Sequence, residues 1–165
     1  MPVSNGPAEG KYINAIGLGS VVSVTLSLDT SAYTDGDVLA ATQEVANAVR
    51  VSGGRAILQS VHVIDLDDQG VGFDLIFLSA NSALGTENSA PDIDDTEVLD
   101  TIGMVRIGSG DYIDLGANRI ATLSGLGLPL KAAEGQTSLW VAAVTRGTPT
   151  YSASGLRLKL GFLWD

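Results

Sequence analysis

Apolar and polar residues alternate in several short segments, which is the pattern of half-buried β-strands. The alternation is clearest in residues 21–28 and 156–164. In the second segment, apolar residues at even positions alternate with Arg157, Lys159, Gly161 and Leu163. Further strands are predicted at residues 38–41, 55–65, 73–79, 102–107, 112–115, 119–124 and 137–146.

The connections are rich in Gly, Asp and Asn, as turns are. The acidic turn Asp67-Asp68-Gln69-Gly70 joins two predicted strands and favours a β-hairpin. Helix and strand compete in residues 43–51, where we favour strand and loop. The polar connection at residues 80–96 is long enough to expect a functional or interface element, and residues 96–101 can form one helical turn.

These elements predict an all-β fold: a single-domain β-sandwich or jelly-roll-like barrel of about eight or nine strands. The order of the strands cannot be read from the pattern. Residues 1–20 show no periodicity and are predicted to be an extended N-terminal arm, with residues 21–165 forming the sandwich domain. A frayed chain end is the alternative interpretation of residues 1–20.

The net charge of the chain limits the classes of partner that it can bind. Nineteen acidic residues against nine basic ones give a net charge of −10, so we expect no nucleic-acid partner. No apolar run approaches the ~18 residues of a membrane span, and we expect neither membrane insertion nor a signal peptide. Charged residues make up only 17% of the chain. This composition fits a surface that contacts other proteins, and equally a Ser- and Gly-rich β-protein without an interface.

Catalytic patterns are missing from the sequence. It contains no cysteine, and its one histidine, His62, lies within a predicted strand, where a structural role is expected. Neither a Gly-x-Ser-x-Gly turn nor a phosphate-binding loop occurs, and the closely spaced glycines are interpreted as turns. We therefore expect no enzymatic activity, no catalytic residue and no cofactor.

Two acidic groups need separate consideration, Asp65-Asp67-Asp68 and Asp92-Asp94-Asp95. Paired carboxylates serve glycosidases, but those enzymes also use aromatic sugar platforms, and aromatic residues are only 5% here. The first group begins like a calcium-binding loop, yet Ile76 stands at the twelfth position, where a glutamate is needed. We predict solvated acidic turns and no metal site.

Carbohydrate binding without catalysis is a rival function, because sugars stack on aromatic rings of β-sandwiches. The candidate rings are Tyr12, Tyr33, Tyr112, Tyr151, Trp140 and Trp164. Both tryptophans fall on strand patterns and are expected in the core. The tyrosines lie near turns, where hydrogen-bonded corners or subunit contacts are equally expected.

The chain contains five short motifs of interest: YTDGDV at residues 33–38, AILQSV at 56–61, DLDD at 65–68, GLPL at 127–130 and VTRGTPTY at 144–151. These motifs resemble those of decoration or cement proteins of tailed bacteriophages. The resemblance implies a β-sandwich that assembles as a homotrimer and holds neighbouring major capsid protein subunits together. It also implies synthesis in the bacterial host cytoplasm and a final location on the capsid surface of the virion. A receptor-binding or carbohydrate-binding module and a tail or neck protein remain alternatives.

Candidate contact residues follow from this hypothesis. The arm, represented by Val3, Tyr12 and Ile13, is predicted to reach a neighbouring subunit. Arg146, Thr148 and Tyr151 are predicted to form an interface or turn cluster where a strand leaves its sheet. Arg146 can equally close an acidic turn within its own chain.

Overall fold

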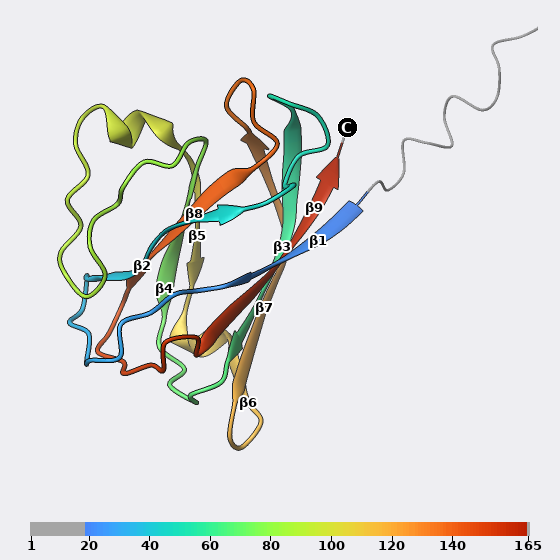
Figure 1. Ribbon diagram of the computed structural model, residues 1–165. Coiled ribbons are helices and arrows are strands. Elements are labelled where there is room, and N and C mark those ends of the chain that lie inside the picture. The colour runs from blue at the N-terminus through green and yellow to red at the C-terminus, as the bar shows by residue number, and fades with distance from the viewer. Residues whose placement is uncertain (1–18, 165) are drawn as a thin grey trace, which may run out of the picture.

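Two antiparallel β-sheets pack face to face in the computed structural model, which describes residues 19–164 (Figure 1). The five-stranded sheet has the order β1-β9-β3-β7-β6 and the four-stranded sheet the order β2-β8-β4-β5. The strands are β1 (Gly19–Thr25), β2 (Val38–Val45), β3 (Arg55–Asp65), β4 (Phe73–Leu78), β5 (Thr101–Ile107), β6 (Tyr112–Asp114), β7 (Arg119–Lys131), β8 (Leu139–Thr145) and β9 (Leu156–Trp164). The only helices in this part of the chain are two short 3-10 helices, η3 (Glu97–Asp100) and η4 (Ser109–Asp111). The predicted all-β sandwich is confirmed.

The strand order is that of a jelly roll. With the short edge strand β6 set aside, the hydrogen-bonded pairs β1–β9, β2–β8, β3–β7 and β4–β5 are those of one long hairpin. This ribbon is rolled up, so that successive pairs alternate between the two sheets. The contacts β9–β3 and β8–β4 then join two pairs into each sheet. Eight strands arranged in this way in two sheets form a jelly roll.

Alternating side chains of the two sheets form the main core. In β9, Leu156, Leu158, Leu160 and Phe162 are buried while Arg157 and Lys159 point outward, as the alternation predicted. Burial of each large apolar side chain contributes about 1.5–3 kcal/mol. Both tryptophans pack against apolar clusters, and Trp164 Nε1 also donates to the carbonyl of Ala48 at 2.9 Å.

The hairpin predicted between residues 55–65 and 73–79 is wrong. β3 pairs with β9 and β7 in one sheet, and β4 pairs with β8 and β5 in the other. Each strand already has a neighbour on both edges, so neither offers a free edge to the other. The acidic turn between them crosses from one sheet to the next, and a local sequence pattern does not distinguish such a crossing from a hairpin.

Strand β7 is longer than predicted. The turn expected after Ser124 is a bulge: Leu58 lies opposite Leu128 and Ser60 opposite Ser124, so three residues of β7 face the single residue Gln59 of β3. Gly125 and Gly127 in this bulge have φ angles of 72° and 61°, which glycine adopts at little steric cost. The strand then resumes through Pro129 and ends at Lys131.

The long connection between β4 and β5 folds back over the four-stranded sheet, on the side away from the five-stranded sheet (Figure 1). Its backbone pairs with β2, because Val38 N–H donates to Ser89 at 2.8 Å and Asn88 N–H donates to Val38 at 2.9 Å. Leu84 and Ile93 pack on a second apolar cluster, formed by Val38, Leu78, Ala142, Val144, Ile76 and Trp140. We call the outer surface of β2, β8 and β4 under this connection the covered face. The predicted helical turn is confirmed as η3, and residues 43–51 form the end of β2 and a turn, as favoured.

Candidate interaction surfaces

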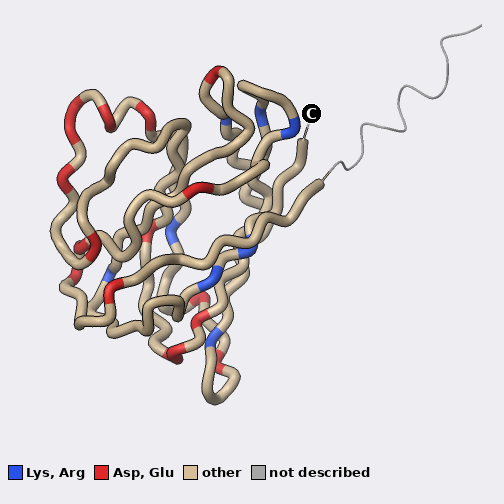
Figure 2. The backbone as a smooth tube through the Cα atoms, viewed as in Figure 1, with Lys and Arg blue, Asp and Glu red and all other residues tan. Residues whose placement is uncertain are grey.

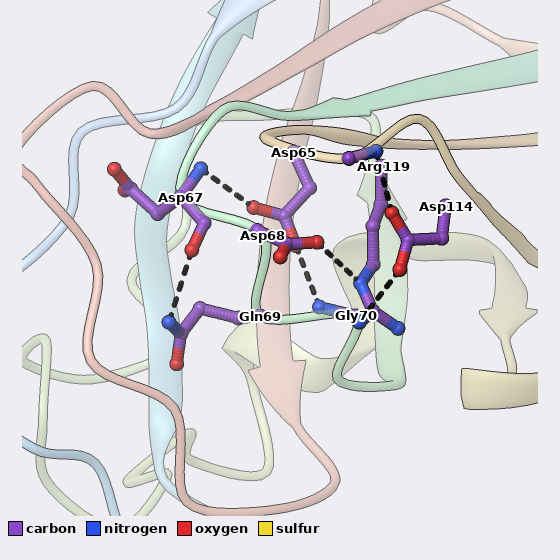
Figure 3. Close-up of polar contacts among 8 residues, drawn as sticks. Asp65, Asp67, Asp68, Gln69, Gly70, Asp114 and Arg119 are labelled. Atoms are coloured by element: carbon purple, nitrogen blue, oxygen red, sulfur yellow. Dashed lines mark hydrogen bonds and ion pairs between the residues drawn. The ribbon is translucent and has the colours of Figure 1, made fainter.

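The acidic turn between β3 and β4 is held by hydrogen bonds within the chain (Figure 3). The buried carboxylate of Asp65 accepts from the N–H groups of Asp67 at 3.0 Å and Gly70 at 2.7 Å. Arg119 Nε donates to Asp68 at 2.7 Å, and its Nη2 lies 3.5 Å from Asp114. The hydrogen bond to Asp68 raises the pKa of Arg119. These contacts give the turn a structural role.

The carboxylates of this turn are not arranged as ligands of a calcium ion. The carboxylate of Asp67 accepts from both the N–H and the hydroxyl of Ser152, at 2.7 and 2.9 Å. Across residues 19–164, no group of three or more His, Asp or Glu side chains is arranged to hold a metal ion.

Arg146 takes part in a three-residue charge cluster on the outer side of the four-stranded sheet. Asp74, only 1% exposed, accepts from Arg106 Nε at 2.7 Å and lies 2.7 Å from Arg146 Nη2. The hydrogen bond from Arg106, aided by Arg146, lowers the pKa of Asp74, although burial opposes it. Arg146 therefore pairs with an acid of its own chain, as the alternative supposed, but this acid lies in strand β4 and not in an acidic turn.

The three residues predicted to cluster after β8 do not share one surface. Arg146 reaches Asp74, and Thr148 is exposed in the β8–β9 connection. Tyr151 is buried in the main core, where burial raises the pKa of its hydroxyl, so its side chain is not available to a partner. An open groove of about 510 Å³ is lined by Arg106, Arg146, Gly72, Ile107, Gly108 and Ser109.

The remaining predicted contacts, Val3, Tyr12 and Ile13, lie outside the described residues, as does most of the predicted arm. The described chain starts at Gly19, which opens β1 and lines a surface groove together with Val21, Gln59 and Leu163. Residues before Gly19 are therefore joined to the molecule at this groove.

The outer surface of the five-stranded sheet has no covering segment in residues 19–164. We call the outward side chains of β1, β9, β3 and β7 the exposed face. Its apolar part includes Val21, Ile57 and Leu163, which are 67%, 43% and 41% exposed. Ile57 lies opposite Leu163 on one side and Pro129 on the other, so these residues form a row across three strands. A groove of about 330 Å³ lined by this row also reaches Trp164 and Arg55.

Cations lie on both sides of this apolar row. Arg55 and Lys131 are register partners at one end, and Lys159 and Arg157 point outward further along β9. None of these four side chains forms an ion pair with a described residue, and no acidic residue occupies an outward position of the exposed face. Figure 2 shows the contrast with residues 80–100, where Asp and Glu are the only charged residues.

His62 lies in the middle of the exposed face, between Lys159 and Thr122. Its Nδ1 is 2.7 Å from the Thr122 hydroxyl. Burial, aided by the charge of Lys159, lowers the pKa of His62, which favours the neutral ring. Its hydrogen bond joins β3 to β7, as expected for a structural histidine.

Sequence reasoning did not identify the exposed face as a site. The alternation in residues 156–164 already placed Arg157, Lys159 and Leu163 on one side of a strand. The sequence does not show that Arg55, Ile57 and Lys131 lie on the same surface, because this depends on which strands are neighbours.

Comparisons with known proteins do not assign the chain to a family. No protein-family model matches the sequence, and no curated protein matches it. Among solved structures, the chain is similar to a chain of Desmodium yellow mottle tymovirus, with 16% sequence identity and a TM-score of 0.30 over 98% of this chain and 89% of that chain. At this level the similarity carries no argument. Neither 3-10 helix of the described chain is long and apolar enough to cross a membrane.

Proposed function

We propose that the protein is a non-enzymatic structural protein of a tailed-bacteriophage virion, which binds the outside of the major capsid shell and stabilises it as a decoration or cement protein. We further propose that it assembles as a homotrimer. The observation that carries the proposal is a jelly roll in which, within residues 19–164, one sheet face is covered and the other is left exposed with an apolar row on it. Viral capsid domains are among the proteins built on this topology.

The composition of the surface supports a role in assembly. Exposed apolar side chains in register across neighbouring strands mark interaction sites when they form a continuous patch. Charged residues are depleted at the centres of protein interfaces, and the chain as a whole carries only 17%. The motifs at residues 33–38 and 144–151, which resemble those of decoration proteins, point the same way.

The predicted arm has a defined role in this proposal. It is joined to the sandwich at the groove beside Gly19, and it contains the apolar pair Tyr12 and Ile13. A segment that binds a neighbouring subunit adds contact area, and many copies on one shell multiply a weak contact. The proposed contacts with the major capsid protein therefore include Val3, Tyr12 and Ile13.

Two measurements on the full-length chain test the proposal. Light scattering is expected to give the mass of a trimer of 17.0 kDa subunits. Co-sedimentation with emptied shells of the phage that carries the gene is expected to saturate at a fixed ratio to the major capsid protein. A monomer that does not bind shells would contradict the proposal, and labelling at one vertex alone would favour a tail or neck protein.

A matched pair of variants tests the arm. Tyr12→Ser combined with Ile13→Ser is expected to weaken shell binding, because it removes the two largest apolar side chains from residues 3–15. Leu115→Ser is the control, since Leu115 is 61% exposed in the turn after β6, away from the apolar row. Equal binding by both variants would exclude the arm from the contact.

A carbohydrate-binding module is the second candidate, because Trp164 lines the groove beside Ile57 and jelly rolls also occur in lectins. Two other candidate rings, Tyr33 and Tyr151, are buried and cannot stack on a sugar. This candidate requires glycan binding that Trp164→Ala abolishes. Shell binding without glycan binding would remove it.

A further inference from the structure

The exposed face has a charge opposite to that of the protein. The molecule carries −10, yet the charged residues at outward positions of β1, β9, β3 and β7 are Arg55, Lys131, Arg157 and Lys159. Elsewhere in residues 19–164, three of four arginines have an acidic partner: Asp74 pairs with Arg106 and Arg146, and Asp68 with Arg119. The four cations of the exposed face have no such partner within the described chain.

The cations flank an apolar centre. From Arg55 to Ile64, which lies beside Arg157, β3 runs nine residues, or about 30 Å at about 3.3 Å per residue. Four strands about 4.8 Å apart give this face a flat area of about 600 Å². A standard protein interface buries about 800 Å² on each partner, so the face approaches the size of a specific docking surface.

The pattern favours a protein over a nucleic acid. Val21, Ile57 and Leu163 lie between the two pairs of cations, where a phosphate backbone would leave them without apolar contacts. Four cations on a chain of charge −10 are also a weak electrostatic footprint for a polyanion. A protein surface with apolar groups framed by carboxylates matches both parts of the pattern.

We propose that the exposed face is the surface that docks on the capsid shell, and that the shell surface it meets is apolar at its centre and acidic around it. This inference rests on the proposed function and adds to it the face and the partner chemistry. The acidic connection at residues 80–100 then points away from the shell, because it covers the opposite side of the sandwich (Figure 1).

The lysines provide a direct test. The sequence has only three, Lys11, Lys131 and Lys159, and the last two lie on the exposed face. Full-length protein, free and bound to emptied shells, is acetylated with an N-hydroxysuccinimide ester and each lysine is quantified by mass spectrometry. We expect acetylation of Lys131 and Lys159 to fall several-fold on binding. Unchanged acetylation of both in the bound protein would overturn the inference.

Charge reversal tests the partner chemistry. Lys159→Glu is expected to weaken shell binding by about tenfold and to reduce its salt dependence, because rim charges steer association. Arg50→Glu makes the same charge change in the turn between β2 and β3, outside the four strands of the exposed face, and is expected to bind like wild type. Equal loss in both variants would show that net charge alone matters and would contradict the inference.

The outcomes separate this inference from the proposed function. Wild-type protein that fails to co-sediment with shells contradicts both. Wild-type binding with both lysines still reactive contradicts the inference alone. A change in native mass for Lys159→Glu would assign the face to contacts between copies. Protection of the two lysines by residues 1–18 in the free protein would assign the face to the arm. Binding of duplex DNA by the wild type would assign it to nucleic acid. Each of these three results overturns the inference.

Discussion

The outer faces of the two sheets differ in how their apolar and charged groups are satisfied. On the covered face, Leu84 and Ile93 of the β4–β5 connection pack over Val38 and Leu78, and Asp74 pairs with two arginines. On the exposed face, Ile57 and its neighbours remain open to solvent and the cations have no acidic partner in the described chain. Residues 19–164 thus complete one face by themselves and leave the other open, and our proposal assigns the open face to a partner.

We therefore expect the covered face to determine stability and the exposed face to determine binding. Substitutions on the covered face remove contacts that the folded chain makes by itself, so they should lower its stability. In our proposal, substitutions on the exposed face remove contacts that form with a partner, so they should lower stability less and reduce binding. Four predictions follow this division.

The largest effect is expected from uncovering the covered face. Leu84 is 3% exposed, and Leu84→Ala is expected to lower the free energy of unfolding by about 2–3 kcal/mol, since it removes buried methyl groups and leaves a cavity. Urea unfolding measures this change. Val51→Ala, at a position 57% exposed, is the control and should change little. Equal stability of the two variants would show that the connection does not act as a cover.

Removing the charge of Asp74 should have the next largest effect. Asp74→Asn weakens charged hydrogen bonds to Arg106 and Arg146 and is expected to cost about 2 kcal/mol. Because these arginines lower the pKa of Asp74 in the folded protein, its contribution is present above the unfolded value near 3.8 and is lost as pH falls below it.

Urea titrations at pH 7 and pH 3 measure both statements about Asp74. Asp114→Asn is the matched control, because Asp114 is 56% exposed and lies 3.5 Å from Arg119. It should cost less than about 1 kcal/mol. If both variants lose the same free energy of unfolding, the prediction that the buried Asp74 stabilises the fold more than the exposed Asp114 is wrong.

A small effect on stability is expected at the centre of the exposed face. Ile57→Ser should lower the free energy of unfolding by about 1 kcal/mol, because the side chain is 43% exposed and contacts apolar neighbours only in the adjacent strands. The same variant should bind shells more weakly than wild type. A large loss of stability with intact shell binding would reverse the roles assigned to the two faces.

The smallest effect concerns His62. Its folded pKa is lowered, so the unfolded chain takes up a proton first as pH falls below about 6.5, and stability decreases in that direction. His62→Gln removes the titrating ring. The variant should lose less stability than wild type between pH 7.5 and pH 5.5 in urea unfolding, and an identical loss in both proteins would contradict this assignment.

Local patterns predicted the strands and the direction of their side chains, but not which strands are neighbours. β9 alternates as expected because one side of it packs on a core. The hairpin between β3 and β4 was wrong because the pairing of those strands is decided by distant segments. The end of β7 was missed because Gly125 and Gly127, which usually mark a turn, form a bulge within it.

The surfaces were harder to predict for the same reason. Leu84 and Ile93 are isolated apolar residues in a polar segment, and only the folded chain shows that they cover a sheet. Tyr151 lies among turn residues, yet its ring reaches the core. Arg55 and Arg157 are distant in sequence and share a surface only because β3 pairs with β9.

The orientation of the protein on the shell tests the central claim most directly. Electron cryomicroscopy of decorated shells shows which sheet faces the major capsid protein. The account predicts that β1, β9, β3 and β7 lie against the shell and that residues 80–100 point outward. A map with residues 80–100 against the shell and the exposed face in solvent would contradict it.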